Sequence, residues 1–330
     1  MDIVAKCVTQ SNPDRKECIV PGSYAHITLV NLAREPARLD AGPGLPNPAA
    51  LALGRWLKHC ELGAVSPDYP YLAIGSKGAA EWADLMHYQH TGDMVKAGVE
   101  EVKGLTGAAR DKAFAWLLGY AAHVITDATI HPVVELKVGP YAQNKTAHRK
   151  CEMHQDAYIF QRLGVGGVGV ADYLKSGIEQ CCVTDGSLDP AISDTWDAML
   201  ERCYPQDFSD NAPDIAQWHK GYTDTLEVVS EGRRLIPIAR HVAVDCGLTY
   251  PLVEEVDRAA YIDSLKTPHG QLPYDQVFDK ALAHVIQGWH LIGEAVFNGS
   301  TVYQTAFWDW DLDTGRDSTN KVVLWEEDAL

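Results

Sequence analysis

Two short stretches of the chain carry histidine and carboxylate side chains at helical spacing. His123, Asp127 and His131 follow one another at intervals of four residues, and His148 and Glu152 repeat that interval further on. On an α-helix, residues four apart lie on one face, so each stretch presents its side chains in a common direction. Two imidazoles with one carboxylate, followed by an imidazole with a second carboxylate, are candidate ligands for a transition metal.

The ligand types indicate the metal and its chemistry. Histidine with carboxylates, and without thiolates, suits zinc in a catalytic rather than a structural role. Five ligands are more than one ion uses comfortably, so we expect two or more ions that share Asp127 as a bridge. Closely spaced ions stabilise both the attacking and the leaving oxygen in phosphoester hydrolysis. The alternative, ordinary hydrogen-bonded histidines, does not explain three ligands on one face beside a second pair.

The remaining histidines carry less information. Six of the 13 histidines lie between residues 87 and 154. His154 is six residues beyond His148, so on a helix it faces away from that ligand and is expected to be structural. Six others have no partner at ligand spacing and are interpreted as packing or surface residues: His59, His219, His241, His269, His284 and His290.

The elements that position the ligands are predicted to be helices. From apolar spacing and start signals, helices are expected at about 23–35, 49–62, 78–104, 107–130, 146–163 and 275–296. Pro132 is expected to end the fourth, because the residue before a proline disfavours the α conformation. Asn144 or Thr146 is expected to cap the fifth. Helix follows helix without an intervening strand pattern, so the predicted fold class is all-α, a multi-helix bundle.

Three regions are expected along the chain: residues 1–163 as the catalytic domain, 164–300 as a helical extension packed on the same core, and 301–330 as an aromatic β-hairpin tail. The glycine-rich run at 164–169 matches G-x-G-x-x-G, but it follows a helix rather than a strand and is interpreted as a hinge. Asp309, Asp311 and Asp313 imitate the start of a calcium loop, yet the later positions do not fit, and solvated strand aspartates are preferred.

Composition limits the function classes. The chain has 28 basic and 45 acidic residues, for a net charge of −17, so nucleic acid is not an expected partner and a phosphate would have to be held by metal. The longest apolar region, residues 113–125, is too short for a membrane span. No basic segment leads into an apolar core at the start of the sequence, so we expect either export without a cleavable signal or a cytoplasmic location. The eight cysteines form no C-x-x-C pair.

The order H-x-x-x-D, then histidine, then H-x-x-x-E resembles the bacterial zinc-dependent phospholipase C family, whose all-α fold is shared with the single-strand-specific trinuclear zinc nucleases. The resemblance covers residues 23–163. Upstream, Tyr24-Ala-His26-Ile-Thr resembles the segment with the family's early histidine. Gly63-Ala-Val-Ser-Pro-Asp68 is similar to the segment with its catalytic aspartate, and Trp82-Ala-Asp-Leu-Met-His87-Tyr to that with its next histidine ligand.

The resemblance implies up to three zinc sites. The implied ligands are Asp68, His87, His123 and Asp127 for the first ion, His131, His148 and Glu152 for the second, and His26 and Asp127, with an N-terminal tryptophan in the family, for the third. This chain has no tryptophan before Trp56, so two or three ions are expected. Three residues separate Asp127 from His131 where the type members have five, so the second site is expected to differ in geometry. His90 remains an alternative to His87.

The function implied by the resemblance is a phospholipase C acting at a membrane or micelle surface. It would cleave phosphatidylcholine-like phospholipids to diacylglycerol and a phosphorylated headgroup, by attack of a zinc-bound hydroxide oriented by Asp68. The alternatives are a single-strand-specific zinc nuclease and a non-enzymatic, zinc-stabilised lipid- or partner-binding protein. Glu152, an aspartate in the nucleases, favours the lipase, and Asp68 favours an enzyme. The tail aromatics are expected to touch the lipid: Phe307, Trp308, Trp310 and Trp325.

Overall fold

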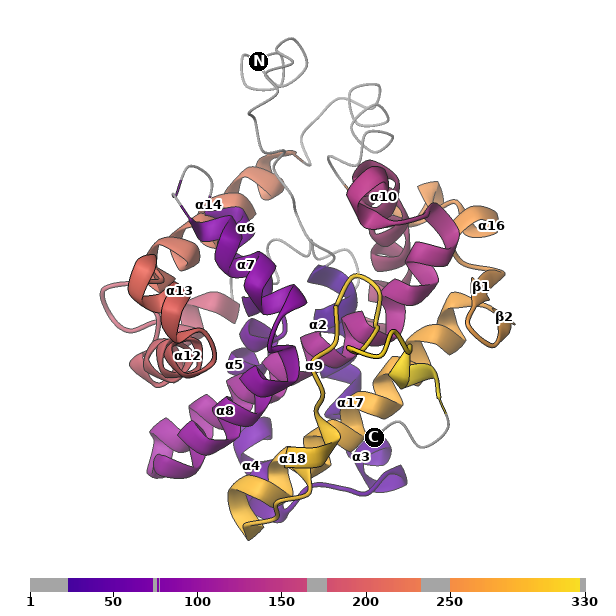
Figure 1. The fold of residues 1–330 in the computed structure, drawn as a ribbon. Coiled ribbons are helices and arrows are strands. Elements are labelled where there is room, and N and C mark those ends of the chain that lie inside the picture. Colours follow the sequence, from indigo (N-terminus) through magenta and orange to yellow (C-terminus); the bar gives the residue numbers. More distant parts are fainter. Residues whose placement is uncertain (1–22, 74–75, 77, 165–176, 233–249, 327–330) are drawn as a thin grey trace.

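The computed structural model describes residues 23–73, 76, 78–164, 177–232 and 250–326, with the side chains of 225–232 left aside. Helices dominate these residues, so the all-α prediction is confirmed (Figure 1). The longer helices are α2 (Ser23–Ala33), α4 (Asn47–Arg55), α5 (Leu57–Gly63), α7 (Ala79–Tyr88), α8 (Thr91–Gly104), α9 (Gly107–Val138), α10 (Tyr141–Ile159), α12 (Pro190–Cys203), α14 (Ile215–Gly232) and α17 (Tyr274–Asn298).

Shorter elements connect the long helices. They are the α-helices α3 (Pro36–Ala41), α6 (Tyr69–Leu72), α13 (Pro205–Asp210), α16 (Arg258–Tyr261) and α18 (Tyr303–Ala306), and the 3-10 helices η1 (Ser66–Asp68), η2 (Phe160–Leu163), η3 (Glu179–Cys181), η4 (Val253–Glu255) and η5 (Val323–Trp325). Strands β1 (Leu265–Thr267) and β2 (Gly270–Leu272) pair in antiparallel register, with Leu265 opposite Leu272.

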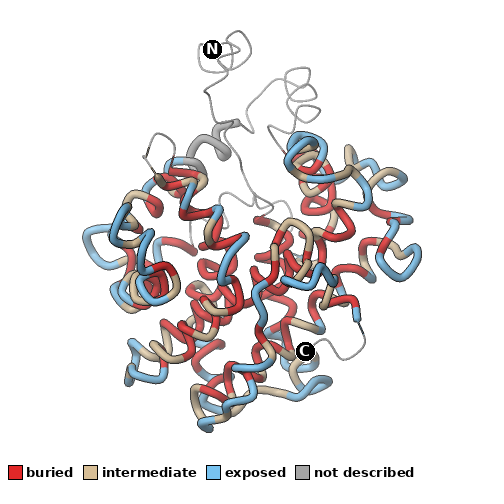
Figure 2. Tube along the Cα trace, viewed as in Figure 1, coloured by how far each residue is buried: buried red, intermediate tan, exposed pale blue. Residues whose placement is uncertain are grey.

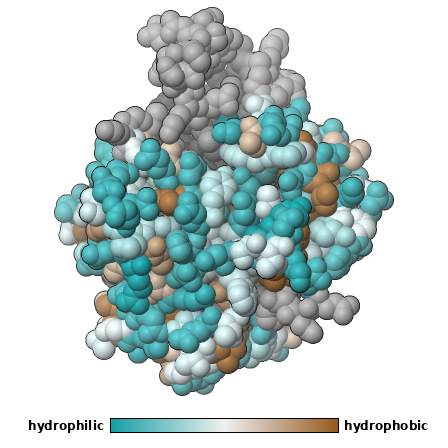
Figure 3. Space-filling model, viewed as in Figure 1, coloured by the Kyte–Doolittle hydropathy of each residue, from teal (hydrophilic) through white to brown (hydrophobic). Residues whose placement is uncertain are grey.

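Helix α9 forms the centre of the bundle. Every residue from Ala113 to Ile130 is buried, and α2, α4, α5, α8, α10, α12 and α17 all pack against this helix (Figures 1 and 2). Among the described residues, α9 alone is long and apolar enough to cross a membrane, and its apolar stretch is entirely covered by the rest of the fold, as in a core helix. The face seen in Figure 3 is mostly hydrophilic, with apolar patches that are small and separate.

Helices α5 and α9 approach closely because each contributes a glycine to the contact. A Cβ atom at Gly63 would lie 2.0 Å from the main-chain oxygen of Trp116, and one at Gly119 would lie 1.9 Å from that of Cys60. The imidazole of His123 then reaches the main-chain oxygen of Ala64, just beyond α5. This close approach also fixes the chain that continues into η1 and Asp68.

Several predicted helix boundaries are wrong. The helix predicted at 49–62 is two helices, α4 and α5, because Trp56 between them is non-helical, with φ −116° and ψ 34°. Helix α9 continues through Pro132 to Val138. Pro132 has no N–H group to donate to the main-chain oxygen of Ala128. Gly315 packs against this oxygen instead. The helix predicted at 78–104 is two helices, because His90 adopts a left-handed conformation with φ 53°. Helix α10 begins at Tyr141, but Asn144, one of the two predicted caps, is non-helical (φ −129°, ψ 26°) and separates a first turn from the main helix that follows.

The carboxy-terminal half packs on the same helices. One hydrophobic cluster runs from Ala25 to Trp325, and α17 lies along α9. The two-stranded hairpin lies at 265–272, so its predicted position within 301–330 is wrong; that tail forms α18, η5 and isolated bridges. In this tail the side chains of Phe307, Trp310 and Trp325 are buried in the bundle. The predicted contact of these three residues with lipid is therefore wrong. Of the run at 164–169, only Gly164 lies among the described residues.

We predict that Gly63→Ala destabilises the protein, because the added methyl group would force α5 away from α9. Such overpacking typically costs about 1–3 kcal/mol of the free energy of unfolding. The control is Gly54→Ala. Gly54 is exposed in α4, and a Cβ atom there would have nothing within 4 Å. Alanine at this position should raise the free energy of unfolding of the protein by about 0.5–1 kcal/mol. Urea unfolding measures both, and equal stability of the two variants would contradict the close-packing argument.

Candidate metal centre

Five segments bring the predicted ligands together around the middle of α9. His123, Asp127 and His131 project from α9, His148 and Glu152 from α10, His26 from α2, His87 from the end of α7, and Asp68 from η1. These segments pack on one another, as α10 and α2 both contact α9 and η1 contacts α7 and α9 (Figure 1). The structure therefore places all eight predicted residues in one cluster, in three groups whose candidate ligand atoms lie within 4.8 Å of one another.

The first group joins Asp68, His87 and His123. His87 Nε2 lies 3.3 Å from Asp68 Oδ1 and 3.4 Å from His123 Nε2. All three side chains are buried, and Asp68 Oδ2 has no hydrogen-bond partner among the described residues. A buried carboxylate oxygen without a partner is costly in a folded protein unless a cation binds it. The group therefore fits a metal ion.

The second group joins His131, His148 and Glu152. Glu152 Oε1 lies 2.9 Å from His131 Nε2 and 3.3 Å from His148 Nε2. Two imidazoles and one carboxylate are three candidate protein ligands, the number that catalytic zinc sites typically have. The shorter spacing between Asp127 and His131 therefore still brings His131 to the ligands on α10.

The third group is centred on Asp127, which also connects the other two. Asp127 Oδ1 lies 3.2 Å from His26 Nε2 and 3.6 Å from His131 Nε2, while Oδ2 lies 3.1 Å from His123 Nε2. The rings of His26 and His123 stack with their centroids 4.3 Å apart.

Main-chain carbonyl groups orient three of the imidazoles. His87 Nδ1 donates to Ala83, His123 Nδ1 to Ala64 and His131 Nδ1 to Leu312, over 2.8, 3.0 and 2.8 Å. A carbonyl oxygen only accepts, so each Nδ1 carries the proton and each Nε2 faces the cluster. This is the usual arrangement around histidine ligands, where the second nitrogen is fixed by a hydrogen bond.

The charges of the cluster stabilise one another. Burial alone would lower the pKa of His87, but the hydrogen bond and charge of Asp68 raise it to about 9. Burial likewise opposes the charge of Asp127, yet His123, His131 and His26 hold its pKa well below the ordinary value. For His131, the charge of Asp127 and the hydrogen bond with Glu152 outweigh burial, and its pKa is raised well above the ordinary value.

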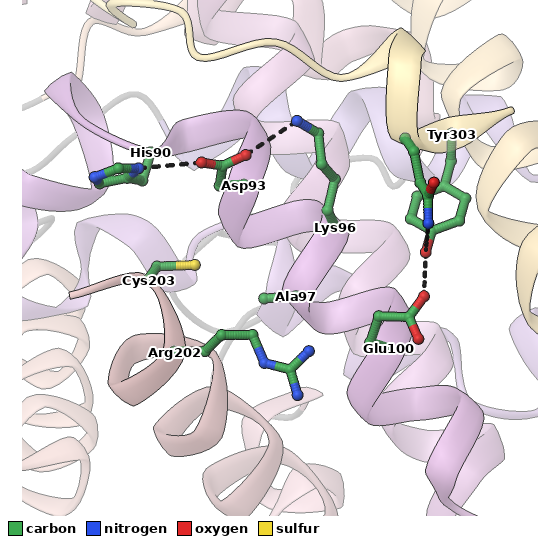
Figure 4. Close-up of a pocket in the computed structure, with 9 residues that line it drawn as sticks. His90, Asp93, Lys96, Ala97, Glu100, Arg202, Cys203 and Tyr303 are labelled. Atoms are coloured by element: carbon green, nitrogen blue, oxygen red, sulfur yellow. Dashed lines mark hydrogen bonds and ion pairs between the residues drawn. The ribbon is translucent and has the colours of Figure 1, made fainter. Parts of the chain in front are cut away.

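The structure places His90 away from the cluster. Its Nδ1 lies 3.1 Å from Asp93 Oδ2 at the surface, on the wall of a cavity of about 460 Å³ between α8, α12 and α18 (Figure 4). None of the eight predicted ligands lines this cavity. His154 is also apart: its Nδ1 accepts the main-chain N–H of Asp257, and its ring stacks on Tyr261. His241 lies outside the described residues.

Sequence reasoning missed the contribution of the carboxy-terminal segment. The carbonyl group of Leu312 binds His131, and Asp313 Oδ2 accepts the hydroxyl of Tyr88 over 2.8 Å. Asp313 lies half-buried in a turn rather than solvated on a strand, and burial raises its pKa. A main-chain carbonyl has no signature in a sequence, and Asp313 is too far along the chain for spacing to connect it with His131.

Comparison with known proteins gives one match. The family described as zinc-dependent phospholipase C matches residues 25–205, more than half of the chain. The matched region runs from α2 past the end of α12, so it includes all eight residues of the cluster. No curated protein and no solved structure matches the chain.

We predict that zinc binding at pH 7 releases protons. In the metal-free protein the raised pKa values keep His87, near 9, and His131 protonated, whereas zinc binds only neutral imidazole. Zinc affinity should therefore rise as the pH increases from 7 to 9. The stabilisation that the metal-free protein gains from protonated His87 is complete below the ordinary pKa near 6.5 and is lost as the pH passes 9.

Calorimetry in two buffers of different ionisation enthalpy counts the protons released. His269→Gln, at the exposed turn between β1 and β2, should release the same number as the wild type, and His87→Gln should release fewer. A heat of binding that is independent of the buffer would contradict the prediction.

Proposed function

The chain belongs to the zinc-dependent phospholipase C family, and we propose that it cleaves phosphatidylcholine-like phospholipids to diacylglycerol and a phosphorylated headgroup. The observation that carries this proposal is the cluster of five histidines and three carboxylates, which five segments of the matched region contribute. A cluster of this composition and size has room for two or three closely spaced zinc ions.

The charge of the protein explains why metal is needed. A chain with net charge −17 repels an anionic phosphodiester, and the cluster itself adds three carboxylates. Zinc, when bound, supplies the positive charge that attracts the phosphate, lowers the pKa of water and stabilises the oxygens of the reacting phosphoryl group. The acidic surface and a phosphate substrate are thus compatible.

Within this proposal the protein's own residues have separate tasks. Asp68, whose Oδ1 lies beside His87 Nε2, is the proposed acceptor for the proton of the attacking water. Asp127 connects the three ligand groups through its two oxygens. The carbonyl groups of Ala64, Ala83 and Leu312 hold three of the five imidazoles in place, so these three do not have to reorient during turnover.

We predict that Asp68→Asn abolishes the release of phosphocholine from phosphatidylcholine. The amide keeps the shape of the side chain but cannot accept the proton, and loss of a general base typically costs about 10²–10⁴-fold in rate. Elemental analysis should find two or three zinc ions in the wild type, and the variant should keep those that the other seven residues hold. Asp207→Asn, an exposed aspartate, is the matched control and should remain fully active.

Two results would overturn the proposed function. One is a wild-type protein that carries zinc and hydrolyses single-stranded DNA in place of phosphatidylcholine. The other is a zinc-loaded protein without hydrolytic activity on either substrate, which would indicate the binding-protein alternative.

We predict that Trp308→Ala weakens hydrolysis at a lipid surface. Trp308 is the only tail tryptophan that the described part of the chain leaves exposed, at 57 %, and aromatic side chains favour the interface of a membrane. Hydrolysis of vesicles should fall, while hydrolysis of a monomeric short-chain phospholipid should not change. Leu51→Ala, at an exposed apolar residue on α4, is the control; equal effects of both variants on vesicles would contradict a specific role of Trp308.

A further inference from the structure

A segment outside the region that matches the family crosses the metal centre. This segment, residues 307–316, follows α18 and is called the strap. Its first anchor is the start of α8, where Asp309 Oδ1 accepts the main-chain N–H groups of Gly92 and Asp93. A Cβ atom at Gly92 would lie 2.3 Å from the main-chain oxygen of Trp308, so the two backbones are in direct contact. The strap is therefore tightly docked where it enters.

The hydroxyl group of Thr91 forms the second anchor. Its Oγ1 accepts the main-chain N–H of Trp310 over 2.7 Å and donates to the carbonyl oxygen of the same residue over 2.9 Å. Thr91 and the side chain of Trp310 are buried. Removal of the hydroxyl group would leave two buried main-chain groups without a partner, which is costly.

Leu312 then connects two ligand-bearing helices. Its main-chain N–H donates to the carbonyl oxygen of His87, at the end of α7, over 2.9 Å. Its own carbonyl oxygen accepts from His131 Nδ1, on α9, over 2.8 Å. One peptide residue thus fixes the position of His131 relative to the helix that carries His87.

The far end of the strap lies against α9. Gly315 has φ +63°, and a Cβ atom there would lie 2.2 Å from the main-chain oxygen of Ala128 and 2.6 Å from Pro132 Cγ. Only glycine fits both the backbone conformation and the space. Ala128 lies between Asp127 and His131, so the strap is seated on the turn of α9 that carries these two side chains.

We propose that the strap is part of the active site and that Leu312 is a positioning residue, whose carbonyl group orients His131 Nε2 toward the second metal position. The inference rests on the proposed use of the cluster to bind zinc. His148 and Glu152 come from a single helix, whereas His131 must reach them from α9, so its orientation decides whether the second group closes. Asp313 accepts the hydroxyl of Tyr88 and so joins the strap to the end of α7 as well.

The test disturbs the strap without touching a ligand. Thr91→Val keeps the shape of the side chain and removes the hydroxyl group, while Thr91→Ser keeps the hydroxyl group and is the matched control. Gly315→Ala displaces the strap from α9, and Gly299→Ala, at a similar positive φ with nothing within 4 Å, is its control. Competition with a chromophoric chelator measures the affinity for each zinc ion in the absence of lipid.

We expect Thr91→Val and Gly315→Ala to bind one zinc ion 10–100-fold more weakly, as is typical when the partner of a histidine ligand is lost, with the remaining ions unaffected. Thr91→Ser and Gly299→Ala should match the wild type, and circular dichroism should show that each variant is folded. Unchanged affinity in both strap variants, or equal weakening of all ions, would overturn the role of Leu312. A wild type that binds zinc but does not hydrolyse phospholipid would instead overturn the proposed function and leave this test intact.

Discussion

The buried carboxylate of Asp127 is the constraint on which the rest of this structure depends. Its side chain is about as inaccessible as the apolar core, at 4 % exposure, and it faces three imidazoles. A carboxylate in such a place costs several kcal/mol unless positive charge surrounds it. Protonated His131, whose pKa is raised well above the ordinary value, provides such charge in the metal-free protein, and bound metal would provide it otherwise. The helices that carry these histidines must therefore pack closely enough to keep the charges together.

Helix α9 meets this requirement although two of its residues, Gly119 and Pro132, weaken the helix locally. The close approach of α5 needs Gly119 in the middle of the helix, where glycine weakens helix formation. Pro132 removes a hydrogen bond one residue beyond His131. Packing offsets the cost at Gly119, because α5 covers the glycine. At Pro132 the missing helical bond leaves room for Gly315 of the strap to approach the main-chain oxygen of Ala128. The strength of the helix thus comes from its neighbours rather than from its own residues.

These same features explain what the sequence could predict. The spacing of His123, Asp127 and His131 shows in the sequence that they share one face of a helix. These ligands lie close together in the chain and follow the helical period. His26 and His87 lie in separate segments, and only the resemblance to a family points to them. Leu312 acts through its main chain, which any residue possesses, so its contact with His131 has no signature in the sequence. The alternation of aromatic residues in the tail predicts a hairpin, whereas in the structure these side chains are buried against the helices. A local pattern cannot show which distant elements a side chain packs against.

The protonation of the cluster couples folding to metal loading. The carboxylates hold His87 and His131 protonated in the metal-free state, and the Nδ1 hydrogen bonds already aim their Nε2 atoms at the cluster. Exchange of the Nε2 protons for metal therefore needs little movement of either ring, because the same carboxylates compensate either kind of positive charge. Metal binding therefore replaces protons on these two imidazoles, and the affinity for metal depends on pH for that reason.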